Sequence, residues 1–162
     1  MKIERIPYSV SGLKNVGTLV YDEAAAKRPL LLMAPNWLGI NPTSTGVAQT
    51  LLADRYVVFM ADMFGEGNAP KGTENPMEFL APLMKDAKAT RSRIVAAFDT
   101  MLSETAKRGI GDSSRRAAIC YCFGGANVLD LARSGADVTA GAAPQGEFDV
   151  AIVGGGIGGV KP

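Results

Sequence analysis

A chain of 162 residues, of which 47% are hydrophobic and 20% charged, has the composition of one globular domain with a sizeable core. Its 17 basic and 16 acidic residues nearly cancel, so charge gives no reason to expect nucleic acid or an anionic membrane as a partner. No apolar run reaches the roughly 18–20 residues of a membrane span, and charges within Met1–Val10 argue against a signal peptide.

The first half of the chain predicts four strands and one helix. Ser11-Gly12 is a turn signal between the first two strands, and the continuous apolar run "PLLLMA" suits a strand buried on both faces. Residues 43–54 fit a short helix with a Thr or Ser cap, and the Gly- and Pro-rich residues 63–76 form a long loop of the kind that is often functional. The strands are expected at residues 2–10, 17–22, 29–34 and 56–62.

The longest periodic segment runs from about Pro82 to Arg108 and predicts one helix with an apolar face. Its charged residues lie largely off that face, which is typical of a solvated helix surface. Gly109 and Gly111 are expected to end the helix. The residues of the apolar face are Leu83, Ala87, Ile94, Phe98, Met101, Leu102 and Thr105.

The second half continues the alternation of strands and helices. Residues 115–121 predict a strand, 124–135 a helix and 136–143 another strand. Strands that alternate with helices indicate an α/β protein with a mainly parallel sheet flanked by helices.

The only two cysteines, Cys120 and Cys122, do not make a disulfide framework, and neighbours along one strand have poor geometry for a bridge. The simplest interpretation is a reduced, cytoplasmic protein. Because the chain has no histidine and only two thiols, we expect no metal site.

The stretch "ICYCFGGANV" has the pattern of a nucleophile elbow, in which a strand ends in a nucleophile and turns at once into a helix. The strained turn requires small residues two positions before and after the nucleophile Cys122, and these are Cys120 and Gly124. The helix N-terminus would then direct N–H groups and a positive dipole at the site. The alternative is an ordinary buried cysteine on a core strand.

Three stretches in the same order resemble the dienelactone hydrolase family of α/β-hydrolases: Leu30–Asn41, Val57–Pro70 and Cys120–Asp137. The resemblance covers residues 1–148, with 149–162 outside it. It implies an α/β-hydrolase-type sheet that is truncated at its C-terminal side, since the chain is similar to the N-terminal portion of the family.

The resemblance also implies a function and a set of site residues. Family members hydrolyse lactone or ester bonds of small, often carboxylated molecules with a Cys-His-Asp triad and without a cofactor. Cys122 matches the nucleophile, and the backbone N–H groups of Phe123 and Trp37 match the oxyanion hole. Asn36 and Gly124 are expected to support them, with Asn36 in the place of a usual glutamate.

Arg91 and Arg93 are the candidates for the arginines that hold a substrate carboxylate in the family. The alternative, favoured by the charge pattern alone, is that both lie on the solvated face of a helix.

The aspartate and histidine of the family's triad lie after later strands, and this chain contains no histidine. A thiolate could still attack an ester, but deacylation without its base should be slow. The second hypothesis is therefore a non-catalytic, truncated hydrolase relic that acts as a binding module or forms homo-oligomers through an exposed sheet edge.

The segment 149–162 carries a G-x-G-x-x-G pattern at Gly154, Gly156 and Gly159, which resembles the start of a dinucleotide-binding unit. Only Val160, Lys161 and Pro162 follow, which is too short for the helix that such a motif requires, so we expect no cofactor. A more ordinary interpretation is an added strand with a Gly-rich end. Together with the cysteine pair, the pattern motivates a third hypothesis, a redox or dinucleotide-binding protein.

Overall fold

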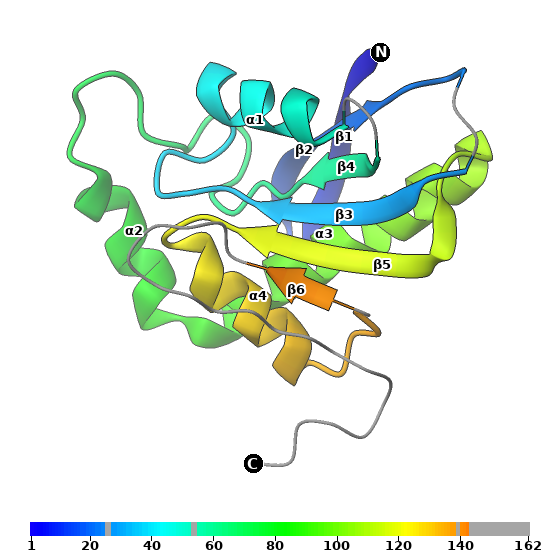
Figure 1. Cartoon of the computed structure of the whole chain (residues 1–162). Helices are drawn as coiled ribbons and strands as arrows, with labels where there is room; N and C mark the ends of the chain where they lie inside the picture. The colour runs from blue at the N-terminus through cyan, green and yellow to red at the C-terminus, as the bar shows by residue number, and fades with distance from the viewer. Residues whose placement is uncertain (25–26, 53–54, 139, 143–162) are drawn as a thin grey trace.

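The computed structural model describes the chain apart from residues 25–26, 53–54, 139 and 143–162. Within these bounds, six strands form one sheet in the order β1-β2-β4-β3-β5-β6, with four helices packed on it (Figure 1). The elements in chain order are β1 Lys2–Val10, β2 Leu13–Tyr21, β3 Pro29–Ala34, α1 Pro42–Leu52, β4 Val57–Met60, α2 Pro76–Lys85, α3 Ala87–Arg108, β5 Asp112–Cys120, α4 Gly124–Arg133 and β6 Ala140–Ala142.

The N-terminal strands form a hairpin, as the turn signal predicts. β1 and β2 pair antiparallel from Lys2 opposite Tyr21 to Val10 opposite Leu13. Ser11 and Gly12 make the two-residue turn with φ of 49° and 83°. Positive φ at both positions matches the twist of the strands and favours glycine, which explains the sequence signal.

The rest of the sheet is parallel apart from one pairing, which confirms the predicted fold class. β3 pairs in parallel with β4 on one side and β5 on the other, and β5 pairs in parallel with β6. β2 joins this block by pairing antiparallel with β4. The carboxyl ends of β3, β4 and β5 therefore meet at one edge of the sheet, and the loops that follow them lie together.

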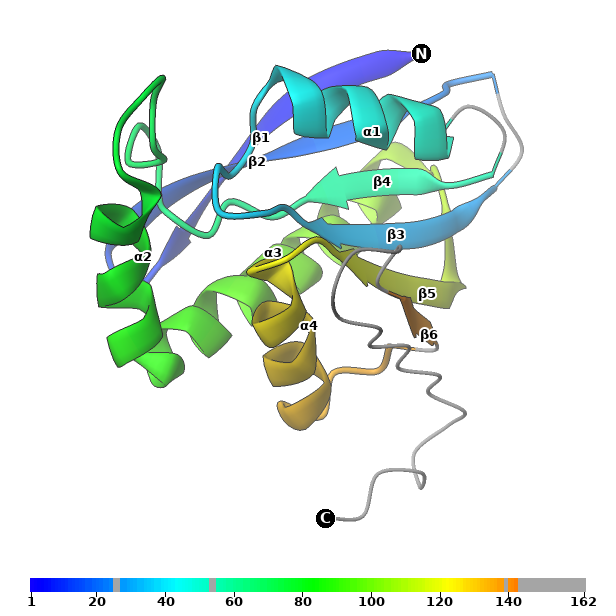
Figure 2. The ribbon, with the colours of Figure 1, turned by 60° about the vertical axis from the view of Figure 1, so that its left-hand side comes forward.

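The central strands bury side chains on both faces. Leu30 and Leu32 belong to the core beneath α3 and α4, whereas Leu31 and Met33 belong to the core beneath α1. Figure 2 shows α1 on one face of the sheet and α2, α3 and α4 on the other. This two-sided burial explains why β3 is an uninterrupted apolar run.

The predicted single helix over 82–108 is wrong, because the segment forms two helices. α2 begins at Pro76 and ends at Lys85, with Pro82 inside it, and α3 begins at Ala87. Between them Asp86 has non-helical φ and ψ of −122° and 78°, and its carboxylate accepts a hydrogen bond from the Ala89 N–H at 2.9 Å. The side chain competes with the helix backbone, which hydrophobic periodicity does not detect.

The predicted apolar face is otherwise largely buried, with Leu102 half-buried and Ala87 exposed in the first turn of α3. Gly109 ends α3 in the left-handed conformation with φ 65°, as expected of a C-terminal glycine. The buried members of the face are Leu83, Ile94, Phe98, Met101 and Thr105.

The cap of α1 also differs from the expected Thr or Ser. Asn41 precedes the helix and accepts a hydrogen bond from the Ser44 N–H at 3.0 Å, while Ser44 Oγ accepts one from the Asn41 N–H at 2.9 Å. This is a reciprocal capping box, with Pro42 at the first helical position, where its missing N–H costs nothing.

None of the helices in the described parts of the chain is long and apolar enough to cross a membrane. The strand predicted over 136–143 is shorter, at Ala140–Ala142. The glycine pattern and the whole segment 149–162 lie outside the described residues.

Candidate active site at the turn between β5 and α4

The turn after β5 has the geometry of a nucleophile elbow. Cys122 has a φ of 51°, which costs a non-glycine residue about 1–2 kcal/mol, and its side chain is exposed. The turn is closed by hydrogen bonds from the Gly124 N–H to the Tyr121 carbonyl and from the Gly125 N–H to the Cys122 carbonyl, both at 2.9 Å. The exposed thiol of Cys122 therefore lies at the start of α4, on a strained backbone.

Gly124 is required by the close approach of β3. A Cβ at this position would lie 2.3 Å from the carbonyl oxygen of Ala34 and 3.0 Å from that of Pro35. Both are backbone atoms that cannot move without bending the strand end. The requirement for a small residue two positions after Cys122 thus has a direct steric cause.

The other small position, Cys120, is part of the core. Its side chain is 3% exposed, and burial raises the pKa of its thiol. Its Sγ lies 4.0 Å from where a Cβ of Gly125 would be. The two cysteines therefore differ in kind: Cys120 packs as a small apolar side chain, whereas Cys122 is open to solvent.

The turn after β3 faces the same edge of the sheet. The carbonyl of Asn36 accepts the Gly39 N–H at 2.9 Å, and its side-chain oxygen accepts the Leu38 N–H at 3.0 Å. Gly39 takes a φ of 65° to complete the turn. Asn36 thus shapes the turn that presents Trp37, whose side chain is 43% exposed.

The two turns are tied together and leave backbone donors unused. The Tyr121 N–H donates to the Ala34 carbonyl at 3.2 Å, which joins the end of β5 to the end of β3. Within the described part of the chain, the N–H groups of Trp37 and Phe123 donate to no protein acceptor. Backbone N–H groups without a protein acceptor are able to bind an oxygen that carries negative charge.

The loop after β4 contacts the turn after β5 and contains a residue that the sequence analysis missed. The buried Asp62 carboxylate accepts three backbone N–H groups, from Val16 at 2.9 Å, Phe64 at 3.0 Å and Gly65 at 2.9 Å. Phe64 then packs against Phe123, with ring centroids 6.4 Å apart. Asp62 therefore fixes the loop that supports the elbow.

Further groups from the hairpin hold Asp62 in place. The Tyr8 hydroxyl donates to the Asp62 carbonyl and accepts from its N–H, both at 3.2 Å, and Asn15 Nδ2 donates to the same carbonyl at 2.9 Å. Burial, with the nearby Asp62 carboxylate, raises the pKa of Tyr8. The sequence signal was an aspartate directly after the apolar strand "YVVFMA".

Comparison with known proteins decides the family. The model of the dienelactone hydrolase family matches residues 16–150. The chain belongs to the dienelactone hydrolase family. This confirms the resemblance on which the site prediction was based.

Solved structures of dienelactone hydrolase-like proteins have the same fold. The protein named m3DLH is 32% identical, with a TM-score of 0.77, over 88% of this chain and 58% of that one. A dienelactone hydrolase-like promiscuous phosphotriesterase from metagenomic libraries is 29% identical, with the same TM-score and coverage. The dienelactone hydrolase from Anabaena variabilis, at 18% identity and a TM-score of 0.59, supports the fold alone.

The chain spans about 58% of the length of these first two relatives. A search of curated proteins gave no match.

The two arginines considered for a substrate carboxylate both have partners within the protein. Arg91 Nη2 lies 3.3 Å from Asp130 Oδ1 on α4, and Arg93 Nη1 donates to the Met63 carbonyl at 2.6 Å. Arg93 thereby ties α3 to the loop after β4. Recognition of a carboxylate by either residue stays a prediction.

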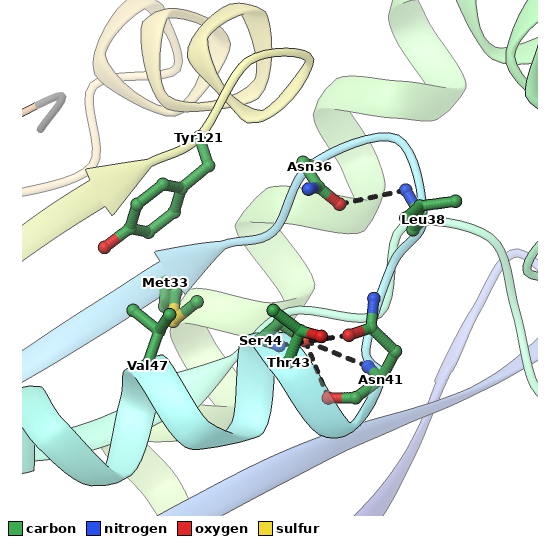
Figure 3. A pocket seen from close by; sticks show the side chains of 8 residues that line it. All are labelled: Met33, Asn36, Leu38, Asn41, Thr43, Ser44, Val47 and Tyr121. Atoms are coloured by element: carbon green, nitrogen blue, oxygen red, sulfur yellow. Dashed lines mark hydrogen bonds between the residues drawn. The ribbon is translucent and has the colours of Figure 1, made fainter. Parts of the chain in front are cut away.

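A small pocket adjoins the two turns, between them and the start of α1 (Figure 3). Its volume is about 120 Å³. Its lining residues are Met33, Asn36, Leu38, Asn41, Thr43, Ser44, Val47 and Tyr121. In the described part of the chain, no group of three Cys, Asp or Glu side chains is arranged to hold a metal ion.

Proposed function

We propose that this chain is an ester and lactone hydrolase of dienelactone hydrolase type in which Cys122 is the nucleophile. The observation that carries the proposal is the exposed Cys122 with a left-handed backbone at the start of α4. Non-glycine residues persist in this conformation only where the surroundings enforce it, and such strain concentrates at functional sites. Membership of the family supports the same role.

In the proposed reaction the Cys122 thiolate attacks the carbonyl carbon of a small ester or lactone, after the thiol has lost its proton to water. A bond forms between Sγ and carbon, and the carbonyl oxygen takes up the displaced electron pair. The N–H groups of Phe123 and Trp37 stabilise this oxyanion. When the carbonyl re-forms, the bond to the alcohol oxygen breaks and the alkoxide or phenolate leaves, so that Cys122 carries the acyl group as a thioester.

Hydrolysis of the thioester needs a base to activate water, and this chain offers no imidazole. We therefore expect fast acylation and slow deacylation for the 162-residue chain. Arg93, beside the loop after β4, is the better placed of the two arginines to meet a substrate carboxylate if its bond to the Met63 carbonyl opens.

The test is stopped-flow release of p-nitrophenolate from p-nitrophenyl acetate. We expect a burst equal to the concentration of protein, followed by a steady state at least tenfold slower. Mass spectrometry should find one acetyl group on Cys122.

The matched control is Cys122→Ala, which leaves the buried Cys120 in place and should abolish both the burst and the acetyl group. Without a burst above this control, the favoured role becomes the non-catalytic binding or oligomerising module. Flavin or nicotinamide in the purified protein would favour the dinucleotide-binding alternative.

The phosphotriesterase relative suggests a second substrate class for the same thiol. Attack of Sγ on phosphorus of a diethyl aryl phosphate would release the aryloxide and leave Cys122 phosphorylated. Loss of titratable thiol at Cys122 with release of one equivalent of aryloxide is the expected result.

We propose that the protein acts in the cytoplasm, where the exposed Cys122 stays reduced. We further propose homo-oligomers through the sheet edge on the side of β6, which is the last strand in the order of the described sheet. Light scattering after size-exclusion chromatography tests the second point, with a single monomeric peak as the contrary result.

A further inference from the structure

We propose that the pocket between α1 and the turns after β3 and β5 binds a short, apolar acyl chain of the substrate. The inference rests on the proposed role of Cys122 and adds a substrate class to it. The proposed occupant is an unbranched acyl group of about four carbons.

The position of the pocket supports this assignment, because residues next to Cys122 and Trp37 in the sequence line it. Asn36 and Leu38, on either side of Trp37, both line it, and so does Tyr121, the residue before Cys122. Figure 3 shows Tyr121 extending from the end of β5 while Asn36 and Leu38 lie on the loop after β3. The pocket is therefore lined by the sequence neighbours of the nucleophile and of one of the proposed oxyanion donors.

The surface that the pocket offers is mainly apolar, although several of its residues are polar. Asn41 Oδ1 accepts the Ser44 N–H at 3.0 Å, and Asn41 Nδ2 donates to the Gly39 carbonyl at 3.2 Å. Ser44 Oγ accepts the Asn41 N–H at 2.9 Å and lies 3.2 Å from the Gly39 carbonyl. These groups satisfy one another, and the apolar part of the lining is Met33, Leu38, Val47 and the Tyr121 ring. Asn36 and Thr43 are the other polar residues of the lining.

The size of the pocket limits the length of the chain. Its volume of about 120 Å³ is somewhat below the roughly 150 Å³ of an apolar cavity that binds benzene. It thus has room for an acyl chain of about four carbons, and carbons beyond these must remain in solvent.

We assign the pocket to the acyl part of the ester because that part stays attached to Sγ in the thioester. The leaving alcohol must depart before water can enter. A pocket that holds the acyl chain favours both the transition state and the intermediate, so its effect should appear in the rate of acylation.

The experiment compares the burst rates of the protein with p-nitrophenyl acetate, butyrate and octanoate. To correct for the intrinsic reactivity of each ester, its burst rate is divided by the rate at which the same ester reacts with a small thiol in solution. Each buried methylene is worth about a fourfold rate gain, so butyrate, with two more methylenes, should exceed acetate by about fifteenfold. Octanoate should gain nothing further over butyrate. Equal rates for all three esters would overturn the inference.

Substitutions at Val47 test whether the acyl chain binds in this pocket. Val47→Phe fills the pocket and should bring the ratio of butyrate to acetate to about one, whereas Val47→Ala should move the optimum to longer chains. Thr50→Ala, at an exposed position of α1 outside the pocket lining, should keep the ratio of the unchanged protein. Circular dichroism checks that Val47→Phe folds. If it does not fold, the chain-length dependence of Val47→Ala alone tests the inference. An unchanged ratio in both Val47 variants would overturn the inference.

A second reagent separates failure of this inference from failure of the proposed function. In alkyl methanethiosulfonates the Cys122 thiolate attacks the sulfenyl sulfur, a disulfide forms and methanesulfinate leaves with the electron pair, so no ester chemistry is involved. If the pocket binds chains, butyl reagent should modify Cys122 several-fold faster than methyl reagent, and Val47→Phe should remove the difference. This result without any ester burst would refute only the proposed hydrolase function, whereas an ester burst without chain-length dependence in either reagent would refute only the pocket.

Discussion

The turn after β5 and the loop after β4 lie at the same edge of the sheet but differ in how their polar groups are satisfied. In the loop after β4, the Asp62 carboxylate accepts three backbone N–H groups, and Tyr8 and Asn15 bind the backbone of the same residue. In the turn after β5, Cys122 has a strained φ, and no protein acceptor in the described part of the chain receives the Phe123 N–H.

This difference suggests that the loop after β4 has a structural role, whereas the turn after β5 carries the proposed chemistry. These hydrogen bonds hold the loop after β4 in one conformation, because a buried N–H group that lost its acceptor would carry a desolvation cost. The turn after β5 has a strained backbone and an unused N–H donor, which in the proposed reaction would bind the substrate oxygen without reorganisation of the protein. Phe64 packs against Phe123 and so connects the two regions.

The largest expected effect is a loss of stability caused by substitution of Asp62 in the loop after β4. Asp62→Ala leaves three N–H groups without their acceptor and should lower the free energy of unfolding by about 3–5 kcal/mol. Urea denaturation followed by circular dichroism measures this. Asp62→Asn keeps one oxygen and should lose about half as much; a loss below 1 kcal/mol in both variants would show that the network is not the support we describe.

Gly124→Ala tests the contact that holds the elbow against β3. The new methyl group would overlap the Ala34 carbonyl oxygen, at 2.3 Å, so we expect a loss of about 2–3 kcal/mol and a slower burst. The neighbouring Gly125→Ala is the matched control, because its methyl group would meet only Cys120 Sγ at 4.0 Å. It should be neutral or stabilising, as alanine favours a helix over glycine. Equal losses in both variants would contradict the steric explanation.

The backbone strain at Cys122 predicts a smaller difference in stability, between two variants of this residue. Cys122→Gly should be more stable than Cys122→Ala by about 1 kcal/mol, since glycine adopts a φ of 51° without a clash. Neither variant has a thiol at this position, so only the backbone is compared. Thermal unfolding of the two proteins at one pH is sufficient, and a more stable alanine variant would mean that the turn is relaxed.

The smallest effect should come from an ion pair far from the site. Arg108 bonds to Glu4 at 2.8 Å and to Glu104 at 2.6 Å. The pKa of Glu4 is lowered by its bond with Tyr21 and then by Arg108, and that of Glu104 by Lys107 and then by Arg108.

Lowered carboxyl pKa values stabilise the fold above the ordinary value of 4.5, and this contribution is lost as the pH falls below it. Arg108→Gln should therefore cost up to about 1 kcal/mol at pH 7 and much less at pH 3. Urea midpoints at both pH values check this, and a difference that grows in acid would refute it.

The sequence was sufficient for features that depend on local pattern. The Ser11-Gly12 hairpin, the apolar strand Pro29–Ala34 and the elbow at Cys122 all follow from short stretches whose neighbours in sequence are their neighbours in space. It failed where a single polar side chain decides the backbone. Asp86 divides the predicted helix, and Asn41 replaces the expected cap of α1.

The role of Asp62 was beyond local pattern for a further reason. One of its three donors, Val16, lies 46 residues earlier on β2, and only the assembled sheet brings the two together. Gly124 illustrates the converse: its place in the motif was visible, but the carbonyl that demands a glycine belongs to β3. Long-range partners of this kind leave no periodic trace in a sequence.

The turn after β3 also gives this protein an optical property. Trp37 is the single tryptophan of the chain, it is partly exposed, and it lies between two residues that line the pocket. The indole emission of the whole protein therefore originates from one position beside the proposed site. Changes in its wavelength or in its quenching by iodide should report events at that turn without an attached dye, and they would be silent for events at the distant end of the sheet.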